Sequence, residues 1–185
     1  MASKNVTATE LANYRISSSA YVVYGGTFIT SAHDYTVYRC GRAKFPSINI
    51  GGGTLNSATL YLKVSYVDAE VSREIRFAVD DSATGYTTAI ASDYTTKTAT
   101  LHDNDVVSID IKSLLNGLSD YNATFYVFGL QMDPDYDGDT ERGAQFDGGI
   151  SPYSGVTPYI AIDYTPSDSQ LYIGTASGNK VCDVY

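Results

Sequence analysis

The sequence carries one sharp chemical pattern, an acidic stretch in which carboxylates recur at every second position and a glycine follows. It reads Asp133-Pro134-Asp135-Tyr136-Asp137-Gly138-Asp139. Calcium takes about six to eight oxygen ligands, and an acidic loop that bends at a glycine can direct several oxygens to one point. We therefore predict a structural Ca²⁺ site in this loop. The expected ligands are Asp133, Asp135, Asp137, Asp139 through its backbone carbonyl, and Asp147 or Glu141.

The acidic loop differs from an EF-hand. An EF-hand needs a bidentate glutamate at about its twelfth position, and that position is Ala144 here. Pro134 is also an unusual neighbour for a calcium ligand. The alternative is a solvated acidic loop whose charges repel one another. If calcium binds, it should raise the melting temperature, and equal melting temperatures in chelator and in millimolar calcium would count against the site.

Catalytic patterns are weaker than the acidic loop. The two histidines lie in His33-Asp34 and His102-Asp103, but adjacency in sequence does not establish a catalytic triad. No nucleophile-elbow motif accompanies them, and no pair of carboxylates is singled out by its surroundings. We interpret both histidines as surface loop residues and expect no enzymatic activity.

Tyrosine is abundant, with 17 residues in the chain. Tyrosine stacks on sugar rings and is common at protein interfaces. We expect Tyr66, Tyr126 and Tyr164 to face the core or to form cross-strand pairs. Four tyrosines in predicted loops are the candidates for ligand contact: Tyr86, Tyr94, Tyr136 and Tyr153. The alternative for each of them is β-propensity and loop packing.

Composition limits the class of protein. The 185 residues, 43% of them hydrophobic, suit one globular domain rich in β-strands. A net charge of -9 argues against nucleic-acid binding, which depends on Lys and Arg. No apolar run is long enough for a bilayer, and the N-terminus lacks the unbroken apolar run of a secretory signal. With no export signal, we expect Cys40 and Cys182 to be free thiols, although pairing stays an alternative.

Short alternating segments predict an all-β sandwich of two antiparallel sheets. The strongest strand is Ala58 to Val67, in which Leu60, Leu62, Val64 and Tyr66 share one face. Ser113 to Leu118 has leucines at helical spacing and predicts one short helix. The other expected strands are 20–24, 35–45, 74–79, two weaker strands within 84–101, 106–111, 124–130 and 159–164.

The two ends of the chain differ from the middle. Residues 1–19 are polar, and we expect a short helix or an N-terminal arm there. Residues 20–165 form the predicted sandwich. Residues 166–185 contain Ser177-Gly178-Asn179-Lys180 between two short apolar runs, which predicts a C-terminal hairpin tail that packs on the sandwich or serves as an edge for another subunit.

Several segments, taken in order, resemble the DNRLRE family of jelly-roll β-sandwich modules. They are Ala20-Tyr21-Val22, Tyr38-Arg39 through Lys44-Phe45, Leu55 through Leu62, Val107 through Ile111 with its following leucine turn, and Pro158 through Tyr164. The resemblance spans about Ala20 to Tyr164. It implies an antiparallel jelly-roll sandwich of the kind found in bacterial surface proteins, polysaccharide-degrading enzymes and phage structural proteins. The chain has no Trp, so the resemblance does not imply a glycan site built on Trp for this chain.

The tail resembles short repeats appended to phage structural proteins, through Leu171-Tyr172-Ile173-Gly174 and Val184-Tyr185. Together the two resemblances imply a non-catalytic virion surface protein, such as a decoration, fibre or attachment module. Its expected partners are further copies of itself, other virion proteins or a surface polysaccharide, with no nucleic acid and no membrane. The first alternative is a calcium-stabilised carbohydrate-binding module of a bacterial extracellular or cell-surface protein, and the second is a polysaccharide-degrading enzyme.

Overall fold

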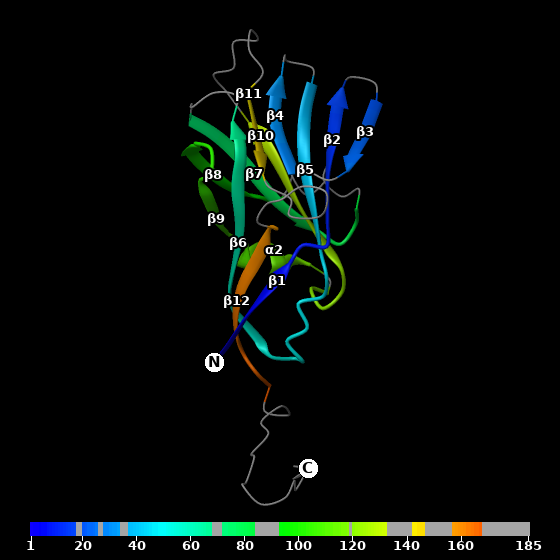
Figure 1. The fold of residues 1–185 in the computed structure, drawn as a ribbon. Coiled ribbons are helices and arrows are strands. Elements are labelled where there is room, and N and C mark those ends of the chain that lie inside the picture. The colour runs from blue at the N-terminus through cyan, green and yellow to red at the C-terminus, as the bar shows by residue number, and fades with distance from the viewer. Residues whose placement is uncertain are drawn as a thin grey trace, which may run out of the picture.

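The computed structural model describes residues 1–17, 20–25, 28–33, 37–67, 72–83, 93–118, 120–132, 142–146 and 157–167. Their regular structure is almost entirely antiparallel β (Figure 1). The strands are β1 Ala2–Thr7, β2 Glu10–Ser17, β3 Ala20–Gly25, β4 Phe28–His33, β5 Val37–Phe45, β6 Thr54–Val67, β7 Ser72–Asp80, β8 Thr95–Thr100, β9 Val106–Asp110, β10 Phe125–Met132, β11 Arg142–Phe146 and β12 Tyr159–Thr165. The helix α2 spans Lys112–Gly117.

The strands form a jelly-roll sandwich, as the sequence predicts. Sheet A has the order β1-β12-β6-β9, and the central part of sheet B has the order β5-β10-β7-β8. If these eight strands are numbered in chain order, the two sheets read 1-8-3-6 and 2-7-4-5, which is jelly-roll connectivity. Strands β2, β3, β4 and β11 add to sheet B.

The long strand β6 belongs to both sheets. Its first part pairs with β12 and β9 in sheet A, and its end pairs with β11 in sheet B. Leu60, Leu62 and Val64 are buried at every second position, as the alternation predicts. Tyr66 does not face the core, because its side chain is 55% exposed, but it does form a cross-strand pair with Gln145 of β11. The register between β6 and β11 shifts between Val64 and Tyr66, so that Val67, opposite Ala144, packs against the core in place of Tyr66.

The first 17 residues are strands of the sandwich, so the predicted N-terminal helix is wrong. Strand β1 pairs with β12 along its whole length, from Ala2 opposite Tyr164 to Thr7 opposite Tyr159. Strand β2 pairs with β3 and β5. Val6 and Leu11 are buried in the core, and this burial outweighs the helix-start signals of the polar residues between them. The segment is therefore part of the fold and does not stand apart from it as an arm.

Other predicted elements are confirmed within the described residues. They are the strands now labelled β3, β5, β6, β7, β9, β10 and β12, the second of the two weak strands as β8, and the helical turn as α2. Strands β4 and β11 were not predicted from the sequence. Both are short, and β11 contains Gly143 and buries only Ala144 and Phe146 among its described side chains.

The core lies between the two sheets and is rich in phenylalanine. Phe45 and Phe125 stack with ring centroids 5.6 Å apart, and Phe28 meets Phe146 edge to face at 5.7 Å. The helix α2 closes part of this core with Leu114 and Leu115. Its first residue, Lys112, donates its backbone N–H to the Asp110 side chain at 2.9 Å, so the turn from β9 into the helix is fixed locally.

The described chain enters and leaves the sandwich at the same end. Ala2 lies opposite Tyr164, and Figure 1 shows the N-terminus beside the end of β12, far from the tips of β2 and β4. Ser167 is held there by a hydrogen bond from its hydroxyl to the Gly51 carbonyl. Beyond Ser167, the predicted hairpin tail lies outside the described residues.

Candidate binding site

Most of the site residues predicted from sequence lie outside the described part of the chain. These are the calcium ligands Asp133, Asp135, Asp137, Asp139 and Asp147, with Glu141, and three of the four loop tyrosines, Tyr86, Tyr136 and Tyr153. Strand β10 ends at Met132, directly before the acidic loop, and β11 begins at Arg142, directly after it. Among the residues that the structure does describe, no three His, Cys, Asp or Glu side chains gather into a metal site.

Tyr94 is the one loop tyrosine of the four that the structure describes. Its side chain is 39% exposed, and the Arg76 guanidinium lies 4.4 Å from the centre of its ring. Arg76 also lies 3.8 Å from the Glu74 carboxylate. One face of the Tyr94 ring is thus covered by a cation from β7, and Tyr94 is not among the residues that line the hollow described next.

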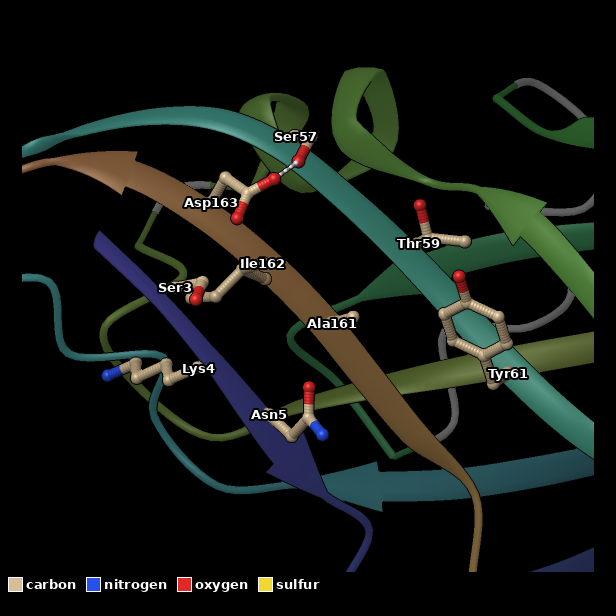
Figure 2. Close-up of a pocket in the computed structure, with 9 residues that line it drawn as sticks. All are labelled: Ser3, Lys4, Asn5, Ser57, Thr59, Tyr61, Ala161, Ile162 and Asp163. Atoms are coloured by element: carbon tan, nitrogen blue, oxygen red, sulfur yellow. Dashed lines mark hydrogen bonds between the residues drawn. The ribbon is translucent and has the colours of Figure 1, made fainter. Parts of the chain in front are cut away.

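The structure brings together a polar hollow on the outer face of sheet A (Figure 2). Its volume is about 360 Å³, near the lower end of the range for small-molecule sites. Strands β1, β6 and β12 supply all of its walls. We call it the sheet A hollow; the residues that line it are Ser3, Lys4, Asn5, Ser57, Thr59, Tyr61, Ala161, Ile162 and Asp163.

Strand register arranges the hollow in three cross-strand rows. The first row joins Ser3, Asp163 and Ser57. The second row joins Asn5, Ala161, Thr59 and Asp110, and the third joins Thr7, Tyr159, Tyr61 and Ser108. Because side chains alternate between the two faces of a strand, all of these residues lie on the face opposite the core.

The two ends of the hollow have different chemistry. At one end the Ser57 hydroxyl donates to Asp163 Oδ2 at 3.0 Å, which fixes the carboxylate. At the other end the rings of Tyr61 and Tyr159 stack, with centroids 4.9 Å apart and planes 13° from parallel. Ala161 lies between these ends (Figure 2). Its small side chain leaves the middle of the hollow open.

This hollow was not predicted from the sequence. The alternation in β6 does place Ser57, Thr59 and Tyr61 together on its polar face. The sequence does not show that β1 pairs with β12, and this pairing is what brings Ser3 and Asn5 beside those residues. A polar N-terminal segment gives no signal of the strand with which it pairs.

Cys40 is buried on the other sheet. It lies on the outer face of sheet B in a small cluster with Ala78 and Phe128, and it is 0% exposed. Its thiol donates to the Gly41 carbonyl at 3.6 Å. Burial raises the pKa of the Cys40 thiol far above its ordinary value of 9.0. The predicted free thiol is confirmed for Cys40, and Cys182 lies outside the described residues.

We expect the Cys40 thiol to resist alkylation and disulfide exchange at pH 8, because the thiolate is the reactive form. In a Cys182→Ser variant, an aromatic disulfide reagent should label no thiol in the folded protein and one in denaturant. Above pH 9 the unfolded chain loses a proton that the folded chain retains. The free energy of unfolding should therefore fall by about 1.4 kcal/mol per pH unit relative to a variant that also carries Cys40→Ala. Equal labelling rates in the folded and denatured protein would contradict this prediction.

Of the two histidines, only the His102 side chain is described, and it lies at the surface. The His102 side chain is 52% exposed, and its Nδ1 lies 3.3 Å from Asp105 Oδ2. This confirms the surface position predicted for His102. His33 is the last residue of β4, so its backbone belongs to a strand and not to a loop.

Two comparisons of this chain with known proteins found no similar family or protein. A scan against protein-family models and a search of curated proteins both found no match.

Within the described part of the chain, no helix combines the length and the apolar character needed to cross a membrane.

Proposed function

We propose that this chain is a non-catalytic module of a virion surface, acting by assembly and by adhesion as a decoration, fibre or attachment protein. The observation that carries this proposal is the position of the first and last residues that the structure describes. Ala2 and Tyr164 are opposite each other at one end of the sandwich. A subunit or segment that meets the described chain near Ala2 or Tyr164 would therefore lie at this end, and Figure 1 shows the tips of β2 and β4 at the other end of the sandwich.

Open strand edges support the assembly part of the proposal. In the described structure, β1 and β9 each have one strand neighbour in sheet A, and β3 and β8 each have one in sheet B. An open edge presents unpaired backbone N–H and C=O groups that can pair with a strand of another copy. We therefore expect a homo-oligomer or a complex with other virion proteins.

The mass of the particle in solution tests this proposal. Light scattering with size-exclusion chromatography should give a trimer or a higher assembly at micromolar protein concentration. A strict monomer would favour the second candidate, a carbohydrate-binding module of a bacterial extracellular protein. The specific observation in favour of that candidate is the sheet A hollow with its stacked tyrosines. In both cases calcium in the acidic loop stays a prediction, and the melting temperature in calcium and in chelator tests it.

A further inference from the structure

The sheet A hollow has the features of a sugar site, and we propose that it binds a neutral oligosaccharide. The inference rests on the adhesion part of the proposed function, and it names the residues and the class of ligand. It differs from the loop tyrosines and the acidic loop predicted from sequence. All of its residues lie on paired strands, and sites on strands are held more rigidly than sites on loops.

The tyrosine pair supplies a rigid aromatic wall. Stacking against Tyr159 fixes the orientation of Tyr61, whose ring borders the hollow. Tyrosine combines a large apolar contact area with little conformational freedom to lose on binding. Pyranose rings carry C–H groups on their apolar faces, and these groups are attracted to the negative face of an aromatic ring. The wall thus suits a ring with polar edges and apolar faces.

Polar groups across the hollow match the edges of a sugar. The Asp163 carboxylate only accepts hydrogen bonds, and Ser57 occupies one of its oxygens. The Asn5 side-chain amide and the Thr59 hydroxyl form no hydrogen bond with another described residue, and both groups can donate and accept. Sugar hydroxyls also donate and accept, so each of these side chains can pair with one. Ala161 leaves room for the ring between them.

Charge selects neutral ligands over acidic ones. Asp163 lies in the hollow, and Asp110 extends its second row. The Lys4 ammonium donates to the Asn49 carbonyl at 2.8 Å, and Figure 2 shows the Lys4 side chain directed away from the hollow. With a net charge of -9 on the chain, uronate, sialate and phosphate groups meet repulsion. A protein partner fits less well, because the centres of protein interfaces are depleted of charge and more apolar.

Binding to a defined panel tests the site. The probes are neutral gluco-, galacto-, manno- and xylo-oligosaccharides, with oligogalacturonate and alginate oligomers as acidic comparators. We expect the wild-type protein to bind at least one neutral probe and neither acidic probe. Tyr61→Ala and Asp163→Asn should each weaken that binding about tenfold, through loss of ring contact and of a hydrogen-bond acceptor. Ala161→Phe should abolish it, because the new ring fills the middle of the hollow.

Tyr66→Ala is the matched control, since Tyr66 is an exposed tyrosine at the far end of the same strand. Its affinity should equal that of the wild type, and the thermal unfolding of each variant shows that it is folded. Failure of the folded wild type to bind any neutral probe, or undiminished binding by Ala161→Phe, would overturn the site. A chain that assembles but binds no probe disproves the hollow alone, whereas a monomer that binds neutral sugar disproves the assembly.

Discussion

Replacing Phe28 with alanine is expected to lower the free energy of unfolding by about 3–5 kcal/mol. Phe28 is 0% exposed and lies in β4, which joins β5 to β11 in sheet B. Its ring meets Phe146 edge to face, with planes 81° apart. Truncation removes this contact and leaves a ring-sized cavity between the sheets. Chemical denaturation followed by circular dichroism measures the loss.

Tyr66→Ala is the control for this prediction, because it removes an aromatic ring of similar size from an exposed position. It should change the free energy of unfolding by less than about 0.5 kcal/mol, as is usual at surface sites. A similar loss for both variants would show that Phe28 does not have the buried position described.

Alternation of apolar residues was sufficient to predict most strands of the sandwich. From Ala58 to Val64 in β6, and at Val107 and Ile109 in β9, every second side chain is apolar and buried. Such a pattern fixes which face of the strand is buried and therefore its register, since a shift of one residue would expose every apolar side chain. Strand β11 is five residues long, and β4 begins with two adjacent apolar residues, Phe28 and Ile29, so neither shows a sustained alternation in sequence. These two strands were therefore not predicted.

The hollow could not be predicted, because it depends on pairing between distant parts of the chain. Its three strands begin at Ala2, Thr54 and Tyr159. No local property of the first segment indicates that Asn5 lies beside Ala161 and not beside another strand. Composition identified tyrosine as important, but it favoured loop tyrosines. The stacked pair Tyr61 and Tyr159 lies instead on the polar face of a sheet.

Gly41→Ala is expected to cost about 1–3 kcal/mol of unfolding free energy through overpacking. Gly41 and Gly129 are direct cross-strand partners beneath the Phe28 ring. A Cβ atom at Gly41 would lie 2.6 Å from Phe28 Cε1, and one at Gly129 would lie 2.8 Å from the same atom. Neither separation is sterically possible without movement. The ring has little room to move, because Phe146 packs against it and no part of it reaches solvent.

A double-mutant cycle separates this clash from a general intolerance of alanine in β5. In a Phe28→Ala background the new methyl group meets empty space, so Gly41→Ala should become neutral or slightly stabilising. Gly117→Ala at the end of α2 is the control, because its Cβ would lie 3.3 Å from the exposed Asp93 side chain and should cost little. If Gly41→Ala costs the same with and without the Phe28 ring, the destabilisation has another origin. The absence of a side chain at Gly41 and Gly129 would then not be what makes room for the Phe28 ring.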